Sequence, residues 1–308
     1  MDIQAAGERR AALAAAVGSN LIWGFLPLAM QAIAKSGPGP WEILSQRIIW
    51  GAVTAGIFVL VARHGDQVRR ALTNPRTLGW LALSSLLVAI NWITFIWAAT
   101  HGRVTESSLG YYILPLVSMA AGAVVFRERL SPFVLGAIAL AALGVAVQAM
   151  ALGRLPWVSL AVSIPFAGYG IVRKRVAVDA QAGLFVECLV LLVPALAVAA
   201  WLGAHGAGHF LMTPRATAWL IASGPLTAVP LALFAWATRR LPLTAMGFLQ
   251  FFSPTVSFLL GVSQGEPFHP LNQLAFGLIW AGVALFLAGA VRSARMAHLA
   301  AEAAQRPE

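Results

Sequence analysis

Long apolar runs separated by short polar loops fill the chain almost from end to end. A membrane-spanning helix needs about 20 predominantly apolar residues to cross roughly 30 Å of hydrocarbon. Eight runs contain no Asp, Glu, Lys or Arg: 11–34, 77–100, 107–126, 130–153, 155–172, 216–238, 241–265 and 267–291. Two further runs, 41–62 and 180–203, are apolar except for Glu42, Arg47 and Glu187. The pattern predicts an all-α membrane protein with ten transmembrane helices.

Proline marks several of the expected helix starts. It is tolerated in the first helical turn, where its missing N–H has no intrahelical partner to lose. Five prolines lie where these spans are expected to begin: Pro132, Pro156, Pro214, Pro242 and Pro270. Ser131 and Thr213 precede two of them and are expected to cap the helix N-termini through their hydroxyl oxygens.

The composition excludes several classes of protein. Residues of the hydrophobic set occupy 59% of the 308 positions, charged residues occupy 10%, and the mean hydropathy is +0.79. A soluble domain carries about 25% charged residues, so neither a soluble enzyme nor a disordered chain fits. The single cysteine, Cys188, cannot form an intrachain disulfide, which excludes a disulfide scaffold.

The net charge of +10 is explained by a membrane rather than by a nucleic acid. Basic residues favour the cytoplasmic side of short loops. With the N-terminus inside, 16 of the 21 basic residues fall in cytoplasmic segments and four, Lys35, Arg103, Arg154 and Arg215, fall outside. Arg47 lies within a span. This alternation predicts a multi-pass protein with both termini in the cytoplasm and no nucleic-acid partner.

The two halves of the chain resemble each other. Residues 95–99 (Phe-Ile-Trp-Ala-Ala) match residues 234–238 (Phe-Ala-Trp-Ala-Thr) at an offset of 139. Residues 111–115 match residues 250–254 at the same offset, and both segments end in proline. Self-similarity at a fixed offset is the signature of a repeated structural unit. The unit here contains five spans.

A repeat of five spans determines the orientation of the second copy. Because five is odd, the second copy enters the bilayer with the opposite orientation. Residues 1–150 are expected to form the first five-helix repeat, and residues 151–308 an inverted second repeat with a short cytoplasmic tail. Inverted repeats recur in transporters that expose one central site alternately to each side. A passive pore or a non-transporting membrane assembly subunit is the alternative, and neither requires this symmetry.

Motifs distributed over residues 11–292 resemble a known family. They are Ile22-Trp23-Gly24 with Pro27, Glu42-Ile43-Leu44 with Arg47-Ile48-Ile49-Trp50, Asn91-Trp92 with Phe95-Ile96-Trp97-Ala98, Ser108-Leu109-Gly110-Tyr111, Tyr169-Gly170 with Arg173-Lys174, and Gly247-Phe248 with Gln250 and Pro254. Together they resemble the RarD-like branch of the EamA transporters, in the drug/metabolite transporter superfamily. The resemblance implies a ten-helix inverted-repeat bundle in a bacterial inner membrane that moves small metabolites or drugs. Alternating access is the expected mechanism, with proton coupling and exchange both open.

Four positions depart from the family pattern. Gln31 replaces a usual lysine, Gln46 a usual histidine, Leu114 a usual asparagine and Phe251 a usual tyrosine. Polar groups are therefore missing from helices that the resemblance implies line the cavity. The substrate of a typical relative does not transfer directly to this chain.

Three charged side chains within the spans are the first candidates for a substrate or ion pathway. A charge near the bilayer centre costs roughly 2.5–3.5 kcal/mol on insertion scales, so it usually faces the protein interior or a water-filled cavity. Arg47 could anchor an anion or act as a fixed counter-charge, and Glu187 could accept a proton as the cavity changes sides. A structural ion pair or a snorkelling side chain is the alternative for both. Glu42 follows Trp41 and could equally be an interfacial side chain.

Neutral polar and aromatic side chains near mid-depth complete the predicted pathway: Trp23, Asn91, Tyr111, Tyr112, Tyr169 and Gln250. Asn91 and Gln250 each carry an amide that needs a partner, whether substrate, water or another helix. Tyr111 and Gln250 occupy matching positions of the repeat, and each lies four residues before a proline, Pro115 or Pro254. Each proline leaves the carbonyl one turn earlier without its helical hydrogen bond. We predict that the helices carrying these two prolines line and gate the path, although proline is also frequent in membrane helices generally.

Common enzyme motifs are missing from the sequence. It has no Walker loop, no His-Glu-x-x-His pair and no Gly-x-Ser-x-Gly elbow, so no catalytic residue and no cofactor is expected. His205 and His209 have i, i+4 spacing, but glycines surround them and further ligands are lacking, so no metal site is expected. The expected partners are a small-molecule substrate and membrane lipid, and the oligomeric state is open.

Overall fold

The computed structural model describes residues 3–126, 131–238, 240–241 and 249–304, and the regular elements in these ranges are helices. The first half of the chain contains α1 (Ile3–Ala34), α2 (Pro40–Val61), α3 (Gly65–Thr73), α4 (Pro75–Thr100), α5 (Val104–Phe126) and α6 (Pro132–Leu152). The second half contains α7 (Trp157–Arg175), α8 (Ala180–Ala204), α9 (Pro214–Ala222), α10 (Pro225–Thr238), α12 (Phe252–Ser263) and α13 (Pro270–Ala304). Within the described residues, seven helical segments are long and apolar enough to cross a membrane. The chain is therefore a multi-pass membrane protein.

The predicted helix starts are confirmed where the structure describes them. Three of the prolines open a helix: Pro132, Pro214 and Pro270. Ser131 and Thr213 act as N-caps, since each hydroxyl oxygen accepts a hydrogen bond from the backbone N–H three residues later, at 3.4 Å and 3.2 Å. Pro156 immediately precedes α7, and Pro242 lies outside the described residues.

The span expected at residues 216–238 is divided in the structure. α9 ends at Ala222 and α10 begins at Pro225, with a turn between them. Pro225 has no N–H with which to continue a helix. Gly224 lies so close to α2 that a Cβ there would be 2.3 Å from the backbone carbonyl carbon of Trp50. A continuous apolar run thus contains a break that its hydropathy does not indicate.

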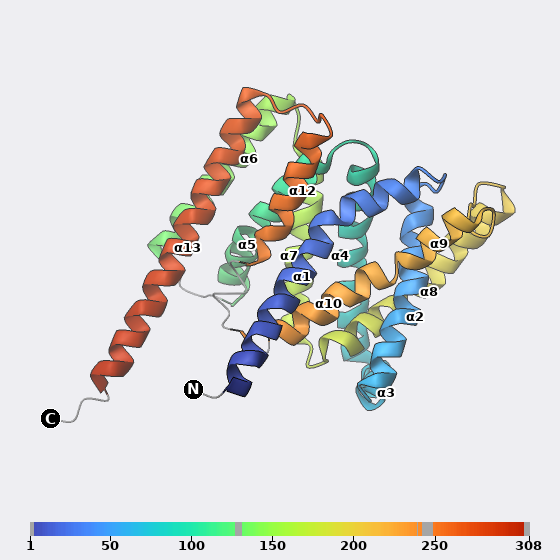
Figure 1. The fold of residues 1–308 in the computed structure, drawn as a ribbon, viewed down its shortest axis with the longest axis horizontal. Helices are drawn as coiled ribbons and strands as arrows, with labels where there is room; N and C mark the ends of the chain where they lie inside the picture. The colour runs from blue at the N-terminus through green and yellow to red at the C-terminus, as the bar shows by residue number, and fades with distance from the viewer. Residues whose placement is uncertain (1–2, 127–130, 239, 242–248, 305–308) are drawn as a thin grey trace.

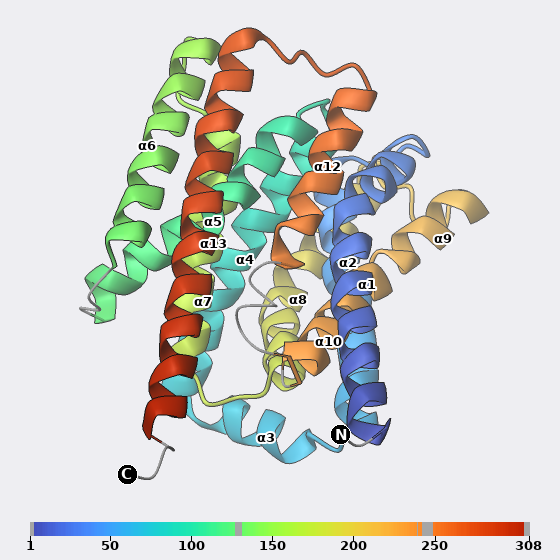
Figure 2. The ribbon, with the colours of Figure 1, turned by 60° about the vertical axis from the view of Figure 1, so that its left-hand side comes forward.

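A short amphipathic helix, α3, follows α2, and the apolar runs do not predict it. Its Val68 and Ala71 are buried, whereas Arg69 and Arg70 are exposed. Figure 2 shows α3 lying across the end of the bundle at which α1 begins and α13 ends. We call this the α3 end, and we call the end at which α1, α4 and α8 finish the opposite end.

Helices from the two halves of the chain pack against each other. α2 packs against α8, α1 packs against α10 and α12, and α7 packs against α4 and α5. α6 and α13 pair with each other along one side of the bundle, as Figures 1 and 2 show. α5 contacts this pair and also α12, so it joins the pair to the remaining helices.

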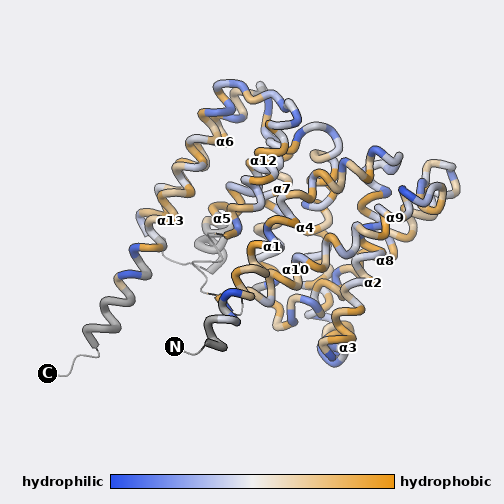
Figure 3. Tube along the Cα trace, in the orientation of Figure 1, coloured by the Kyte–Doolittle hydropathy of each residue, from blue (hydrophilic) through white to orange (hydrophobic). Residues whose placement is uncertain are grey.

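Polarity is arranged as a lipid environment requires. Large apolar side chains lie on the outside, for example Val193 at 75% and Leu86 at 56% exposure. Arg47, Asn91 and Glu187 are buried between helices. Figure 3 shows that the most hydrophilic stretches lie at the helix ends and in α3. Because hydrocarbon offers polar groups no partners, this distribution fits a surface that faces lipid.

We predict that Gly110→Ala lowers the thermal stability of the purified protein. α5 and α7 approach each other so closely that a Cβ on Gly110 would lie 2.7 Å from the carbonyl oxygen of Ser159. Overpacking of this kind costs about 1–3 kcal/mol, so the melting temperature in detergent should fall. Gly170→Ala on α7 is the control, because its Cβ would meet no atom within 4 Å. Equal melting temperatures for the two variants would contradict the close contact.

Candidate functional site

A cationic side chain is buried between α2, α4, α5 and α8. Arg47 of α2 is 4% exposed, and its guanidinium carbon lies 4.8 Å from the centroid of the Trp92 ring on α4. Its Nε and Nη1 atoms have no hydrogen-bond partner among the residues that the structure describes. Tyr111 and Cys188 are ionisable side chains near enough to interact with it electrostatically. Among the residues that the structure describes, this cation therefore contacts an aromatic ring and pairs with no carboxylate.

Two further predicted residues lie near Arg47 and are fixed by hydrogen bonds. The side-chain amide of Asn91 on α4 donates to the carbonyl oxygen of Val162 on α7 at 2.8 Å. The Tyr111 hydroxyl on α5 donates to Asn91 Oδ1 at 3.3 Å. The Asn91 amide thus bonds neighbouring helices and holds the Tyr111 ring in place. We call Arg47, Trp92, Asn91 and Tyr111 the central site.

Glu187 forms a second buried cluster, nearer the α3 end. The carboxylate accepts hydrogen bonds from Ser84 Oγ at 2.6 Å and from Tyr169 OH at 3.3 Å, and its Oε1 lies 3.7 Å from Arg173 Nη1. The residue is 1% exposed. One arginine and two hydroxyls therefore compensate a carboxylate that would be unfavourable if buried alone. We call Glu187, Ser84, Tyr169 and Arg173 the Glu187 cluster.

Arg173 is a member of this cluster that the charge pattern assigns only to the cytoplasmic segments. Its guanidinium lies over α8 at Gly183, where an added Cβ would overlap it. Its Nη2 also donates to the carbonyl oxygen of Asp179 at 3.2 Å. Gly183, eight residues after the end of α7, is the local sequence signal that an arginine side chain folds against α8 at this point.

A cavity of about 350 Å³ lies beside the Glu187 cluster. Tyr169 and Arg173 line it together with apolar side chains of α2, α8 and α10, among them Phe58, Leu184 and Leu231. Its walls come from both halves of the chain. A largely apolar wall with a few convergent polar groups is typical of a small-molecule site.

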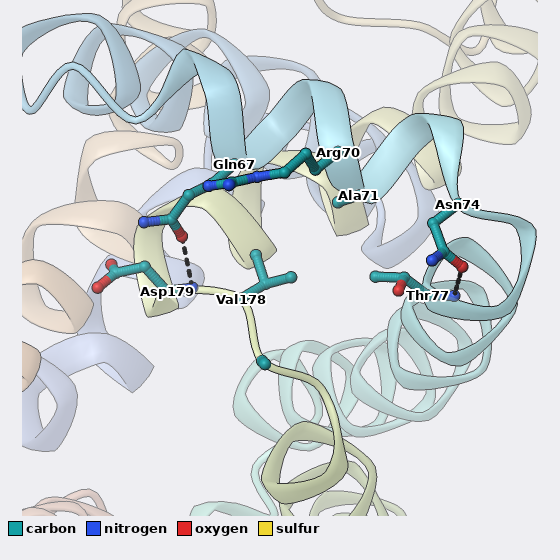
Figure 4. Close-up of a pocket in the computed structure, with 8 residues that line it drawn as sticks. Gln67, Arg70, Ala71, Asn74, Thr77, Val178 and Asp179 are labelled. Carbon is teal, nitrogen blue, oxygen red and sulfur yellow. Dashed lines mark hydrogen bonds between the residues drawn. The ribbon is translucent and has the colours of Figure 1, made fainter.

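A second cavity, of about 470 Å³, lies at the α3 end itself (Figure 4). Its walls include Gln67 and Arg70 of α3, Thr77 of α4 and Asp179. The Asp179 N–H donates to Gln67 Oε1 at 3.0 Å, which ties α3 to the loop between α7 and α8. The described walls of this cavity contain no residue that the sequence predicted for the pathway.

Glu42 is buried in the first turn of α2. It is 3% exposed, and its carboxylate accepts hydrogen bonds from the backbone N–H groups of His209 at 2.5 Å and Phe210 at 2.9 Å. His209 Nδ1 also lies 2.9 Å from Glu42 Oε2. These contacts join α2 to the loop that follows α8, at the opposite end. The described residues contain no group of three or more possible metal ligands.

Two more polar contacts join the halves of the chain at the opposite end. Glu266, which follows α12, accepts hydrogen bonds from the N–H groups of Val104 and Thr105 at the start of α5, at 2.6 Å and 2.8 Å. Gln31 of α1 and Gln264 exchange two amide hydrogen bonds of 2.9 Å and 2.8 Å. The sequence predicts neither contact.

Besides Glu42, three predicted residues lie outside the central site and the Glu187 cluster. Trp23 of α1 packs against Phe234 of α10, with ring centroids 5.5 Å apart. Tyr112 is buried, and its hydroxyl shares a hydrogen bond of 2.7 Å with Thr255, which joins α5 to α12. Gln250 is exposed. Among the described residues, none of these three side chains has a hydrogen bond or ring contact with Arg47 or Glu187, although Trp23 packs against the same apolar core as Tyr111 and Tyr169.

The two predicted gating prolines lie on α5 and α12, which contact each other. Pro254 is buried and falls in the first turn of α12, which begins at Phe252. A proline in the first turn leaves no intrahelical hydrogen bond unmade, so its bending effect is confined to the start of this helix. The side chain of Pro115 lies outside the described part of α5.

We predict a graded loss of thermal stability for variants of the Glu42 contact. Glu42→Ala removes the acceptor for two loop N–H groups and for His209, and leaving such donors unpaired costs about 1–3 kcal/mol. Glu42→Gln keeps one carbonyl acceptor and His209→Ala removes only the ring contact, so both should lower the melting temperature less. A wild-type melting temperature for Glu42→Ala in detergent would contradict a structural role for this carboxylate.

Comparisons with known proteins point to one family. The EamA-like transporter family matches residues 10–150. Protein RarD of Streptomyces exfoliatus is 37% identical over 311 residues, which cover 98% of this chain and 96% of that protein. Protein RarD of Escherichia coli (strain K12) is 34% identical, over 94% of this chain and 98% of that protein. An uncharacterized transporter of Pseudomonas aeruginosa is 40% identical, over 89% of this chain and 92% of that protein.

A solved crystal structure of another protein aligns with this chain at a TM-score of 0.57 and 20% identity, covering 91% of this chain and 98% of the other. At that identity the likeness concerns the fold alone. The relatives by sequence exceed 30% identity over nearly the whole chain, and the apolar helices described above agree with them. The chain therefore belongs to the EamA-like transporter family, in its RarD-like group, and is a membrane transporter.

Proposed function

We propose that the protein is a secondary transporter that moves a small metabolite or drug across a bacterial inner membrane by alternating access. Ten transmembrane helices form two inverted five-helix repeats, residues 1–150 and 151–308, and both termini face the cytoplasm. The substrate binds near the bilayer midplane, between the central site and the cavity beside the Glu187 cluster. This region is open to one side of the membrane at a time.

The pattern of helix contacts supports the inverted repeat. The repeat equates α1, α2, α4, α5 and α6 with α7, α8, α9–α10, α12 and α13. Under this correspondence the contact of α1 with α10 becomes that of α7 with α4, and the contact of α1 with α12 becomes that of α7 with α5. The α2–α8, α5–α12 and α6–α13 contacts each map onto themselves. A pseudo-two-fold axis generates such a pattern, whereas two unrelated halves have no reason to produce it.

The observation that carries the proposal is the unpaired charge of Arg47 within the bundle. The residue lies seven positions into α2, or roughly 10 Å from the helix end at 1.5 Å per residue. Charged side chains at such a depth mark substrate or ion pathways. An open pore would hydrate the guanidinium, but Arg47 is only 4% exposed. A path that is closed at this level is what a carrier requires.

The contacts at the opposite end support a conformation that is closed there. Gln31, Glu42 and Glu266 each bond the other half of the chain at that end. The 350 Å³ cavity lies on the side of Arg47 toward the α3 end. With the α3 end in the cytoplasm, this conformation is the inward-facing state. Formation of the outward-facing state then requires the contacts at the opposite end to break.

Glu187 is the proposed coupling residue. When ionised, its carboxylate attracts Arg173 across 3.7 Å and ties α8 to α7. Protonation removes that attraction and leaves Arg173 to interact with another anion. A proton shifts the balance between two conformations only through a contact that differs between them, and the Glu187–Arg173 pair supplies one. Exchange of one substrate molecule for another does not need this step.

We predict that linking the opposite end stops transport. The side chains of Gln31 and Gln264 bond each other directly, so cysteines at both positions, in a Cys188→Ala background, should react with a short, reducible bifunctional thiol reagent. In proteoliposomes the linked protein should take up no more of a substrate identified by thermal shift than empty vesicles do. Reduction of the linker should restore uptake of that substrate. The two single-cysteine variants, treated in the same way, are the controls. Uptake that continues in the linked protein would favour the passive pore.

We predict that Glu187→Gln separates uphill transport from exchange. The variant keeps the shape of the side chain but cannot bind and release a proton. In proteoliposomes with a pH gradient, accumulation of a substrate identified by thermal shift should be lost, while counterflow of labelled against unlabelled substrate continues. Glu106→Gln changes another buried carboxylate, which pairs with Arg103 and Arg154, and is the matched control. Undiminished accumulation in Glu187→Gln would remove Glu187 from the coupling role.

A further inference from the structure

We infer that the substrate is an organic anion whose carboxylate binds the guanidinium of Arg47 in the central site. This substrate class rests on the proposed function and deepens it. Three features indicate it: the carboxylates around the path already have partners, Arg47 has unused donors in a fixed orientation, and the charges along the path sum to a positive value.

The carboxylates around the central site are engaged elsewhere. Glu42 binds the loop at His209, Glu187 lies against Arg173, and Glu266 binds the start of α5. In the part of the chain that the structure describes, no carboxylate oxygen lies within 4.0 Å of an Arg47 nitrogen. The guanidinium is nevertheless almost completely buried. Burial of a charge without a counter-charge is unfavourable, so the surroundings of Arg47 favour the binding of an anion.

Arg47 holds its unused donors in a fixed orientation. The Trp92 ring packs against the guanidinium with 4.8 Å between the carbon and the ring centroid. Such packing covers a face of the planar group and leaves its N–H groups to bind an acceptor, and Nε and Nη1 lack one among the described residues. A carboxylate fits, because charge-assisted hydrogen bonds to a guanidinium are short and strong. A neutral amide or alcohol would occupy the donors but leave the charge uncompensated.

The charges along the path favour anions over cations. Arg47 and Arg173 contribute two positive charges, and Glu187 contributes one negative charge when ionised and none when protonated. An organic cation would therefore meet an excess of positive charge in both protonation states. The wall of the cavity that Arg173 lines is mostly apolar, with Phe58 and Leu231 among its residues. The chemistry of the site matches a carboxylate attached to an apolar body.

A thermal-shift assay on the purified full-length protein tests the substrate class. The probes are hexanoate, 3-phenylpropionate and N-acetylphenylalanine, each with its primary amide, and the first two with their matching amines. A ligand that binds the folded state raises its melting temperature. We expect at least one carboxylate to raise it and its amide and amine not to. The shift should be abolished in Arg47→Gln and partly retained in Arg47→Lys.

The matched control is Gln46→Met, which changes the neighbouring buried residue of α2 and should keep the ligand-induced shift. The substrate class would be overturned by any of three results. An amide or amine could raise the melting temperature as much as its carboxylate, the shift could persist in Arg47→Gln, or every carboxylate could leave the melting temperature unchanged.

A second measurement needs no ligand. If the protein without substrate buries the Arg47 charge uncompensated, Arg47→Met should melt at or above the wild-type temperature, because it removes the charge and keeps an unbranched side chain. A structural ion pair predicts the reverse, since loss of one partner leaves the other buried alone. A melting temperature for Arg47→Met below those of both wild type and Gln46→Met would overturn the assignment of Arg47 to an anion site.

Flux measurements in proteoliposomes separate failure of this substrate class from failure of the transporter proposal. Counterflow and uphill accumulation of a carboxylate, both lost in Arg47→Gln, would support the two together. Binding that depends on Arg47, with flux that never exceeds equilibration, would overturn the transporter proposal and leave the anion site standing. Uphill accumulation of an amine that persists in Arg47→Gln would overturn the anion site and leave the transporter standing.

Discussion

A polar group placed in hydrocarbon has no water to bond and must find its partner within the protein. This constraint explains how helices far apart in the sequence are joined. Ser159 of α7 donates to the carbonyl oxygen of Glu106 on α5 at 2.7 Å, and Ser257 of α12 donates to that of Gly24 on α1 at 2.9 Å. The two helix pairs are equivalent in the proposed repeat. Each uses a small hydroxyl residue to satisfy its polar group on the backbone of the neighbouring helix, which also brings the helices close together.

The helices could be predicted from the sequence because their causes are local. Apolar length and the position of proline act within one segment, and they indicated the starts of α6 and α13 correctly, although α13 continues to Ala304, beyond the apolar run that ends at residue 291. The break before Pro225 combines the missing N–H of that proline with the approach of Gly224 to the backbone at Trp50, and hydropathy alone indicates neither. The apolar runs did not predict α3, because its apolar stripe, Val68 and Ala71, is too short to count as a membrane span.

The candidate site could be predicted only in part. A charged residue within an apolar run is expected to be buried in the protein, so Arg47 and Glu187 could be identified as candidate pathway residues from the sequence. The residues that contact them could not be predicted in this way. Arg173 has the spacing of a topology signal and nevertheless reaches back to Glu187. The proposed repeat equates α2 with α8, yet Glu42 on α2 bonds backbone N–H groups of a loop whereas Glu187 on α8 bonds hydroxyls and an arginine. Equivalence of two helices therefore does not predict the partners of their carboxylates.

A carrier needs two conformations of nearly equal free energy, separated by contacts that break readily. The amide pair of Gln31 and Gln264 is exposed, so water can replace its hydrogen bonds, and a neutral hydrogen bond of this kind contributes only about 0.5–1.5 kcal/mol. The α6–α13 contact is different: a Cβ on Gly144 would lie 2.9 Å from the Ala275 carbonyl oxygen, and water cannot enter such an interface. In the proposed mechanism this pair therefore moves as one unit while the contacts at the opposite end exchange. Under the same proposal Arg47 sets the direction of the balance, because an anion that compensates its charge lowers the free energy of whichever conformation encloses the site most completely.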